Sequence, residues 1–347
     1  MACELGKMGQ EKARTPTIAC ERGRTDGGRF EDEKEDDDDF EIVGFRRTWE
    51  LCYASDYGSF EDITVPSMRY TFRPFPKNAI RQGGLQFFSA KVAELKEEEG
   101  LHWPLHVYGL IATRDSADPR RNLLFDRTRD SCQIITQEDP ILQLTGPSRA
   151  VVLIDPVTIE VQLKAKCKTE SEDKVLNFSV FEYSHQDSYE EPPFLTTIYT
   201  RCKRSKLEFA VAFLVQSVEA TVRVRVVRGS WPDHFRGQIM SRTASISHGA
   251  IVLLDSRYGR MNFNKYGVIE LSRCVVSVEP CGQLKVDVVA SQVDDDRNVV
   301  AQGLVDFTPK MAGVSHGICD LGFCVLRFSV HWSLPCYAGE HVGLITK

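Results

Sequence analysis

The sequence has no long hydrophobic run, and this absence limits where the chain can reside. Its longest apolar segment, residues 209–215, is seven residues long, whereas a membrane-spanning helix needs about 20. The first 14 residues carry charged side chains without a continuous apolar stretch, so they lack the pattern of a secretory signal. We therefore expect no membrane span and a cytoplasmic location, with a nuclear location as the alternative because residues 201–206 form a short basic cluster.

The sequence also lacks the spacings that bind metals and cofactors. Its 11 cysteines are scattered and include no Cys-x-x-Cys pair. Neither a phosphate-binding glycine loop nor a dinucleotide fingerprint occurs. A chain of 347 residues can bury a sufficient core without cross-links. We therefore expect free thiols, no metal ion and no cofactor.

Charge is distributed unevenly along the chain. The formal net charge is -6, but residues 31–39 hold eight acidic residues and one lysine, which leaves residues 40–347 nearly neutral. Residues 1–40 are predicted to be a disordered acidic tail because they contain too few apolar residues to offset the entropy of ordering. Residues 41–82 are predicted to be a linker with a short helix at about 44–53. The basic residues form no continuous face with interleaved aromatics, so no specific nucleic-acid partner is expected.

The body of the chain shows the alternation of β-strands. In residues 157–166 (VTIEVQLKAK), apolar and polar residues alternate with a period of two, as in a sheet with one buried and one solvated face. Similar short runs, separated by turn residues, continue to residue 335 without intervening helices. We therefore predict an all-β fold of two consecutive antiparallel β-sandwich-like halves, residues 83–205 and 206–335, followed by a C-terminal tail at 336–347.

Two details of this fold stay open in the sequence. Residues 85–95 fit both a helical stripe and a strand face, and the family resemblance described below favours the strand. The two halves also contain similar segments, residues 151–155 (VVLID) and 251–255 (IVLLD), at an offset of 100. A second similarity relates residues 159–163 to 269–271 at an offset of 110. Because all strands have similar compositions, these similarities leave open whether the two halves arose by duplication.

A dense region of arginine and acidic residues is the first candidate binding site. Its guanidinium groups could bind phosphate through two parallel hydrogen bonds. The alternative is a self-paired loop that fixes the edge of the sandwich, which the near balance of acids and bases favours. The residues concerned are Arg114, Asp115, Arg121, Asn122, Arg127, Arg129 and Asp130.

An acidic loop is the second candidate. Asp294, Asp295 and Asp296 lie between two predicted strands, where loops of a sandwich end can gather the roughly six to eight oxygen ligands that calcium requires. A solvated hairpin tip is the alternative. The loop therefore predicts at most a calcium-responsive surface.

Arrangements typical of catalysis are weak. His102 and His106 flank a proline, and an extended chain would place them about 13 Å apart, too far for one metal ion. His316, Cys319 and Cys324 are close in sequence, but Cys324 begins an apolar strand, where cysteine is usually a small core residue. We therefore assign no catalytic residue.

Several short motifs recur in an order typical of one family. They include residues 103–109 (WPLHVYG), 144–147 (LTGP), 155–157 (DPV), 254–257 (LDSR), 270–273 (ELSR) and 319–324 (CDLGFC). In their order, over about residues 83–335, the chain resembles the grass family that carries the domain of unknown function numbered 6598. The resemblance implies a plant protein without an established activity.

Some members of that family are labelled as, or fused to, ribosome-inactivating rRNA N-glycosidases. Such an enzyme uses a helix-borne glutamate, followed three residues later by an arginine, to stabilise the transition state and protonate the leaving adenine. We assign no such pair in residues 83–347, and Glu21 with Arg24 lies in the predicted tail. The resemblance therefore carries no site residue over to this chain.

Together these observations favour a non-catalytic interaction module with a protein partner, acting in plant stress or defence. One alternative is an rRNA N-glycosidase or a related defence hydrolase, which rests on the family labels. The other is a calcium- or lipid-responsive β-sandwich, which rests on the acidic loop.

Overall fold

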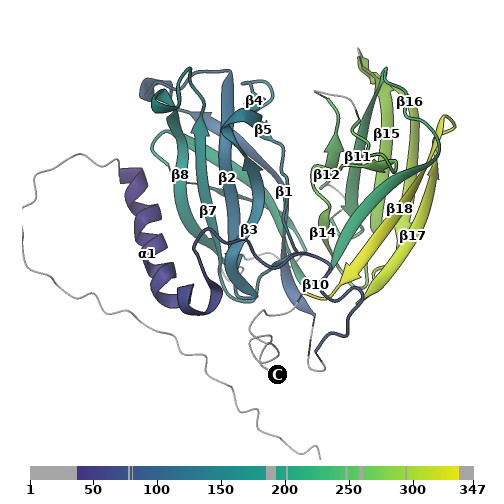
Figure 1. The fold of residues 1–347 in the computed structure, drawn as a ribbon, viewed down its shortest axis with the longest axis horizontal. Coiled ribbons are helices and arrows are strands. Elements are labelled where there is room, and N and C mark those ends of the chain that lie inside the picture. The colour runs from purple at the N-terminus through teal and green to yellow at the C-terminus, as the bar shows by residue number, and fades with distance from the viewer. Residues whose placement is uncertain are drawn as a thin grey trace, which may run out of the picture. The chain divides into compact units, whose positions relative to one another are not determined.

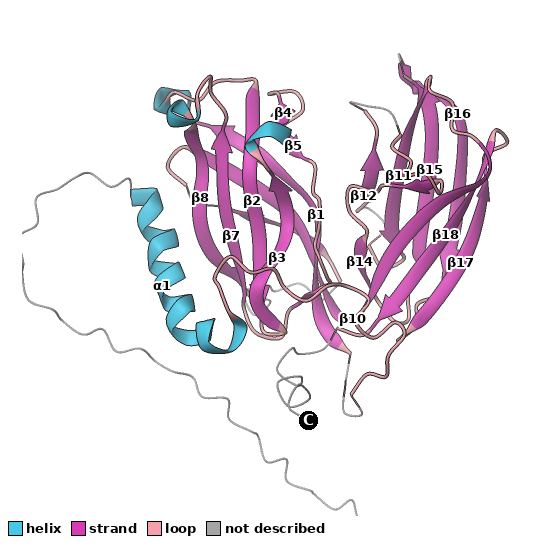
Figure 2. Cartoon of the chain, viewed as in Figure 1, coloured by secondary structure: helices cyan, strands magenta, loops and turns pink. Residues whose placement is uncertain are grey.

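The computed structural model confirms a mostly β chain built from antiparallel sheets (Figures 1 and 2). The described residues are 37–76, 79, 81–184, 193–200, 202–246, 249–257, 261–293 and 295–335. Their elements up to the middle of the chain are α1 Asp37–Tyr57, β1 Gln82–Leu95, β2 Leu105–Asp115, β3 Asp118–Arg127, β4 Gln133–Ile135, β5 Ile141–Leu142, β6 Val151–Val152, β7 Val157–Ala165, β8 Lys174–Tyr183 and β9 Leu195–Tyr199. The later elements are β10 Ser205–Gly229, β11 Phe235–Thr243, β12 Ile251–Asp255, β13 Val268–Ile269, β14 Val275–Val278, β15 Leu284–Gln292, β16 Asp295–Phe307, β17 Gly313–Asp320 and β18 Cys324–Ser333.

The first sandwich packs two sheets around one apolar core. One sheet has the order β3-β2-β7-β8, with β4 also paired to β2. The other contains β1, the first part of β10, and β9, with β5 and β6 paired to β1. Val157, Ile159 and Val161 of β7 are fully buried in this core, as the period of two in the sequence predicts.

Glu160 departs from that period. It lies on the outward face of β7, yet its side chain is fully buried. Helix α1 and the residues after it cover this part of the sheet, because the Trp49 indole donates a 2.8 Å hydrogen bond to the Pro119 carbonyl and Ile63 forms a β-bridge with Arg121. The chain that the sequence predicts to be a linker therefore creates a buried polar layer outside the sheet.

The N-terminal part of the body is more helical than expected. Helix α1 begins earlier and ends later than the expected short helix at about 44–53. Residues 1–36 of the predicted tail lie outside the described residues, and residues 37–40 begin α1. No helix in the described part of the chain is long and apolar enough to cross a membrane. Residues 85–95 belong to β1, which confirms the strand alternative.

The second sandwich has its own apolar core. Its four-stranded sheet has the order β12-β11-β15-β16. The opposing layer contains the second part of β10, together with β18 and β17, and β13 and β14 pair with β10. Phe328 and Trp332 of β18 and Val286 and Val288 of β15 are fully buried in the same apolar cluster.

Strand β10 belongs to both sandwiches (Figure 1). Its residues 205–217 pair with β1, and its residues 219–229 pair with β18. Phe209 lies in the first core, whereas Val222 lies in the second. The two predicted halves therefore share one continuous strand instead of being joined by a loop.

The two sandwiches have the same strand connectivity. The order β3-β2-β7-β8 corresponds to β12-β11-β15-β16, and β1-β10-β9 corresponds to β10-β18-β17. The short strands β5 and β6 pair with β1 as β13 and β14 pair with the second part of β10. This repetition supports the duplication that the sequence leaves open.

Equivalent strands also carry similar residues. Residues 109–114 (GLIATR) in β2 match 237–242 (GQIMSR) in β11, at an offset of 128. Residues 148–156 (SRAVVLIDP), which include β6, match 272–280 (SRCVVSVEP), which include β14, at an offset of 124. Both offsets given above were wrong. The offset of 100 joins β6 to β12, although these strands pair with β1 and β11 respectively. The offset of 110 joins β7 to β13, although these strands pair with β2 and β10 respectively.

Candidate functional site

Arg114 and Arg121, two of the predicted binding residues, share one buried carboxylate. Arg114 Nη2 lies 2.9 Å from Glu160 Oε2, and Arg121 Nη2 lies 2.5 Å from Glu160 Oε1. The Arg114 guanidinium also lies over the Phe60 ring, 4.0 Å from its centroid. Burial lowers the pKa of Arg114 below its ordinary value, although the charge of Glu160 opposes this shift. Both guanidinium groups are thus engaged within the fold.

Asp115 and Asn122 hold the segment that leads into β6. Arg149 Nη1 and Nη2 donate to the two carboxylate oxygens of Asp115 at 2.8 and 2.7 Å. The Asn122 amide oxygen accepts from the Ser148 N–H at 2.8 Å, and its amide nitrogen donates to the Arg149 carbonyl at 3.0 Å. These side chains therefore fix residues 148–152 against the turn between β2 and β3.

The other three predicted residues lie at the opposite end of β3, which Arg127 ends, and just beyond it. Arg127 donates to Gln143 at 2.8 Å, and Arg129 Nε lies 2.6 Å from Asp173 Oδ2. Asp130 is exposed. The structure thus divides the seven predicted residues among separate groups, and most of their charges are paired inside the chain. Phosphate binding by this region stays a prediction.

Asp173→Asn should make the unfolding temperature less sensitive to acid. The Arg129 guanidinium and the Tyr108 hydroxyl, which donates at 2.8 Å, hold the pKa of Asp173 below its usual range. A carboxylate whose pKa is lowered by folding adds stability above its unfolded pKa of about 3.9, and this stability is lost as the pH falls further. Thermal unfolding from pH 7 to pH 3 should show the gap between wild type and variant closing in acid. A gap that is constant with pH would contradict the assignment.

The predicted acidic loop lies only partly within the described residues. Asp294 falls outside them, while Asp295 and Asp296 begin β16, and nothing is described of their side chains. Within the described ranges, no group of three or more His, Cys, Asp or Glu side chains could hold a metal ion. Calcium binding by this loop stays a prediction.

The cysteines near the end of the chain do not form an activated pair with His316. His316 is exposed, whereas Cys319 is buried and lies three residues along β17, hence on the opposite face. Burial raises the pKa of Cys324 to about 11 and also raises that of Cys319. Both thiols are therefore protonated at neutral pH and lack the thiolate character of a nucleophile.

One glutamate and arginine pair with the N-glycosidase spacing does occur in the body, so our assignment of none in residues 83–347 was wrong. Glu270 and Arg273 lie between β13 and β14, in chain that is not helical. Arg273 is buried, and its Nη2 donates to the Phe87 carbonyl at 2.8 Å, so it holds β1 to the second sandwich. Burial lowers the pKa of Arg273 to about 10. The pair therefore lacks the helical setting that this chemistry uses.

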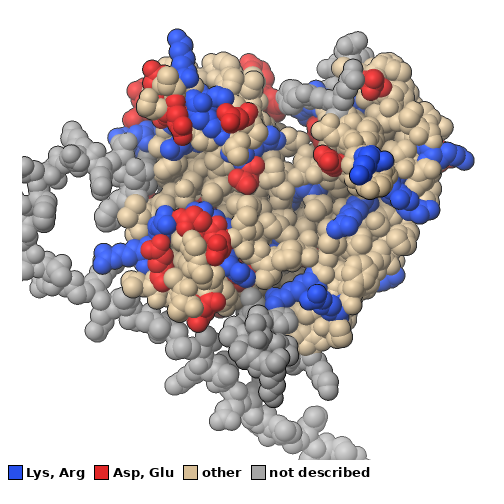
Figure 3. All heavy atoms as spheres, in the orientation of Figure 1, with Lys and Arg blue, Asp and Glu red and all other residues tan. Residues whose placement is uncertain are grey.

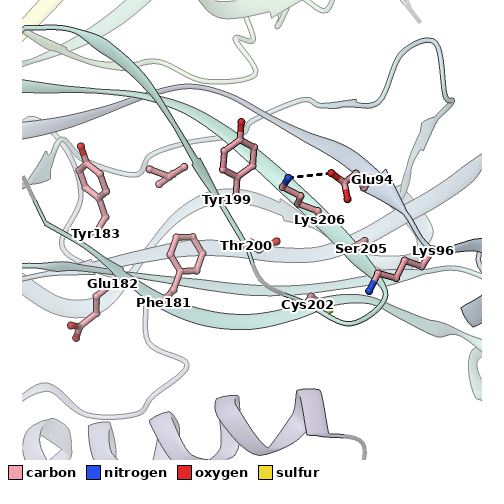
Figure 4. A pocket seen from close by; sticks show the side chains of 11 residues that line it. Glu94, Lys96, Phe181, Glu182, Tyr183, Tyr199, Thr200, Cys202, Ser205 and Lys206 are labelled. Atoms are coloured by element: carbon pink, nitrogen blue, oxygen red, sulfur yellow. Dashed lines mark hydrogen bonds and ion pairs between the residues drawn. The ribbon is translucent and has the colours of Figure 1, made fainter. Parts of the chain in front are cut away.

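An open groove of about 610 Å³ lies between β8 and β9 (Figure 4). Its wall includes the aromatic rings of Phe181 and Tyr199. Lys206 Nζ lies 3.1 Å from Glu94 Oε1 and 4.4 Å from the Tyr199 ring centroid. Because these charges neutralise each other, and because residues 185–192 between β8 and β9 lie outside the described residues, we assign no ligand to the groove.

Unpaired positive charge gathers instead on the outer face of the second sandwich. Arg223 and Arg225 of β10 and Arg327 of β18 are exposed, while the alternate residues Val222 and Val224 are buried. Arg225 lies directly opposite Arg327 in the antiparallel register. None of the three arginines forms an ion pair with any residue that the structure describes. We call Arg223, Arg225 and Arg327 the arginine face.

The equivalent surface of the first sandwich is neutralised. There, Lys91 of β1 lies 2.8 Å from Glu208 of β10, and Lys206 of β10 lies 3.1 Å from Glu94 of β1. In the view of Figure 3, acidic and basic atoms are mixed over the first sandwich, whereas mainly basic atoms lie over the second. Like charges that lie directly opposite in a sheet are destabilising. The outer face of the second sandwich thus carries unbalanced positive charge, whereas the equivalent surface of the first sandwich does not.

Residues 65–73, which we call the strap, border the arginine face. The Tyr70 N–H donates to Ser333 Oγ at 3.0 Å, and the Gly313 N–H donates to the Thr71 carbonyl at 3.0 Å. Phe72 is 75% exposed, and its ring meets the edge of the His331 ring at 5.8 Å between centroids. The strap therefore presents an exposed aromatic residue beside the arginine face.

Sequence reasoning missed this face although part of its signal was present. The alternation of valines and arginines in residues 222–228 predicts a strand with arginines on one side. Arg327 lies about a hundred residues later, and its position opposite Arg225 depends on the register of β10 and β18. Only the paired sheet reveals that the arginines are together and lack acidic partners.

Comparison with known proteins agrees with the sequence motifs. The family model described as "Domain of unknown function (DUF6598)" matches residues 84–330, whereas no curated protein matches the chain. Among solved structures, the C2A and C2B domains of Extended-Synaptotagmin 2 have 10% identity and a TM-score of 0.26, with 79% of this chain and 99% of that chain covered. Human GIVD cytosolic phospholipase A2 has 9% identity and a TM-score of 0.21, with 73% of this chain and 30% of that chain covered. These two likenesses are too weak to carry an argument. Because the family model spans most of its length, the chain belongs to the family defined by this domain of unknown function.

Proposed function

We propose that the protein is a non-catalytic binding module whose arginine face takes an anionic partner. The observation that carries the proposal is the position of Arg225 directly opposite Arg327. Neither arginine forms an ion pair with a described residue, whereas the equivalent strands of the first sandwich carry balanced ion pairs. An anion placed between two facing guanidinium groups removes their repulsion and accepts charge-assisted hydrogen bonds from both.

The sequence suggests a protein partner in plant stress or defence. The arginine face favours a partner whose surface is negatively charged. Plant origin and a defence role rest on the family resemblance alone. The N-glycosidase alternative gains no support, because Arg273 is buried against backbone carbonyls. The calcium alternative depends on Asp294 and its neighbours, which lie outside the described side chains.

The double variant Arg225→Glu/Arg327→Glu should bind heparin, a polyanion of no particular sequence, roughly thirtyfold more weakly than wild type. Loss of two cations near an anionic surface costs about 1 kcal/mol each, and the new carboxylates add repulsion. Isothermal titration at fixed salt measures the dissociation constant.

The matched control is Lys168→Glu/Lys203→Glu, which changes the net charge equally at two exposed lysines of the first sandwich. The control should bind almost as wild type does. Equal losses in the two double variants would mean that net charge, and not the arginine face, determines binding, and the proposal would fail.

A further inference from the structure

We propose that the anionic partner of the arginine face is the surface of an anionic lipid bilayer, with Phe72 inserted among the headgroups. This inference rests on the proposed function. A bilayer would make apolar contacts with the protein in addition to the charge interaction, and these contacts distinguish it from other polyanions.

Exposed apolar residues lie in register with the arginines. Across three strands, Arg225 of β10 faces Arg327 of β18, which in turn faces Ile318 of β17. Ile318 is 54% exposed. In the adjoining rows Arg223 faces Ser329, which faces His316. Three arginines and an exposed aliphatic residue therefore lie on one outward sheet surface.

The strap extends this surface with an aromatic residue. Thr221 faces His331, two residues from the Arg223 row, and the Phe72 ring packs against the His331 ring. Arg223 Nη2 lies 3.7 Å from Met68 Sδ, which ties the strap to the arginine face. Arg73, next to Phe72, is exposed and forms no ion pair with any residue that the structure describes. The surface thus holds four exposed arginines beside two exposed apolar side chains.

The exposed position of Phe72 is fixed by the backbone around it. In addition to the bonds of Tyr70 and Thr71, the Met68 N–H donates to the buried carboxylate of Glu219 at 2.6 Å. Met68 has a φ of 64°, a left-handed conformation that is rare for a residue with a side chain. The exposed Phe72 ring is therefore presented by an ordered segment.

This combination fits a bilayer better than a nucleic acid. At a membrane surface, arginines contact anionic headgroups while aromatic and aliphatic side chains enter the interface. Proteins that bind single strands stack successive bases on several aromatic side chains. The outward positions of β10, β18 and β17 around the arginines hold serine, histidine, threonine, isoleucine and Asp320, which is paired with Arg228. They offer no such row of aromatic rings.

The expected affinity is large enough to measure. Each basic residue near an anionic membrane surface strengthens binding by about fivefold, so four arginines together give a factor of several hundred. This contribution should fall steeply with salt, because exposed charges are screened over about 10 Å at 0.1 M. Binding to vesicles without anionic lipid should be negligible.

The test is sedimentation of the full chain with two kinds of vesicle. One contains phosphatidylcholine alone, and the other also contains roughly 30% phosphatidylserine, which gives its surface a strong negative potential. We expect binding only to the anionic vesicles. Arg225→Glu/Arg327→Glu should weaken it at least twentyfold, and Phe72→Ala about fivefold. The matched control for Phe72→Ala is Leu51→Ala, at an exposed apolar residue of α1 that is 81% exposed, which should leave binding unchanged. Circular dichroism checks that each variant is folded.

The possible results distinguish failure of bilayer binding from failure of anion binding as a whole. If wild type binds heparin but not anionic vesicles, the bilayer is overturned and the anion-binding function survives. If it binds single-stranded RNA more tightly than vesicles, and Phe72→Ala has no effect on vesicle binding, the bilayer is likewise overturned. If it binds neither heparin nor vesicles, the proposed function itself fails.

Discussion

Arg149→Met should lower the free energy of unfolding by about 3–5 kcal/mol, the cost of removing one partner from a buried ion pair. Arg149 donates to both oxygens of Asp115 and to Thr64 Oγ1 at 2.8 Å. Asp115 and Arg149 are both almost fully buried. Methionine fills similar space but leaves the carboxylate without its cation. Chemical denaturation followed by circular dichroism measures the change.

Two further variants make this result specific. Arg46→Met removes an arginine whose side chain is 46% exposed and whose partners are Glu50 and Glu61, so it should cost no more than about 1 kcal/mol. Adding Asp115→Asn to Arg149→Met should recover part of the loss, because the remaining group is then neutral. If Arg46→Met were as damaging as Arg149→Met, the buried pair would have no special role.

Phe328→Ala, in the core of the second sandwich, should destabilise the first sandwich as well. Phe328 is fully buried, and such a truncation typically costs about 3–5 kcal/mol. Because β10 is continuous through both sandwiches, unfolding of one removes the strand pairing of the other. We expect hydrogen exchange by mass spectrometry to show faster exchange of the globally protected amides in both β7 and β15.

The reciprocal variant completes this test. Phe125→Ala, at a fully buried residue of the first core, should accelerate exchange in β15 to a similar degree. Acceleration confined to the sandwich that carries the substitution would show that the two repeats unfold independently. In that case the shared strand would not couple them.

The alternation in residues 157–166 was sufficient to predict a strand, because side chains of a strand point alternately to two faces. It could not predict that Glu160 is buried, since that depends on the distant residues Trp49 and Phe60 covering the sheet. In residues 85–95 the local spacing fits both a helix and a strand. Pairing with β10, which is distant in sequence, determines that they form a strand.

The candidate site likewise depends on contacts between residues that are distant in sequence. Three of the seven residues predicted from local density, Arg114, Arg121 and Arg129, prove to be paired with acids that are distant in sequence. A fourth, Asp115, is paired with the distant Arg149. The arginines without partners could be recognised only after β10 and β18 were placed in register. Charge density in a sequence indicates where ions are, whereas the fold decides which of them remain free.

The most direct test of the central claim is the salt dependence of heparin binding by wild type and by Arg225→Glu/Arg327→Glu. Each cation that contacts a polyanion releases counterions, so it adds roughly one unit to the slope of log affinity against log salt. We predict that the double variant has a slope shallower by about two, while Lys168→Glu/Lys203→Glu keeps the wild-type slope. A slope that is unchanged in the double variant would show that Arg225 and Arg327 do not contact the anion, and it would contradict the account.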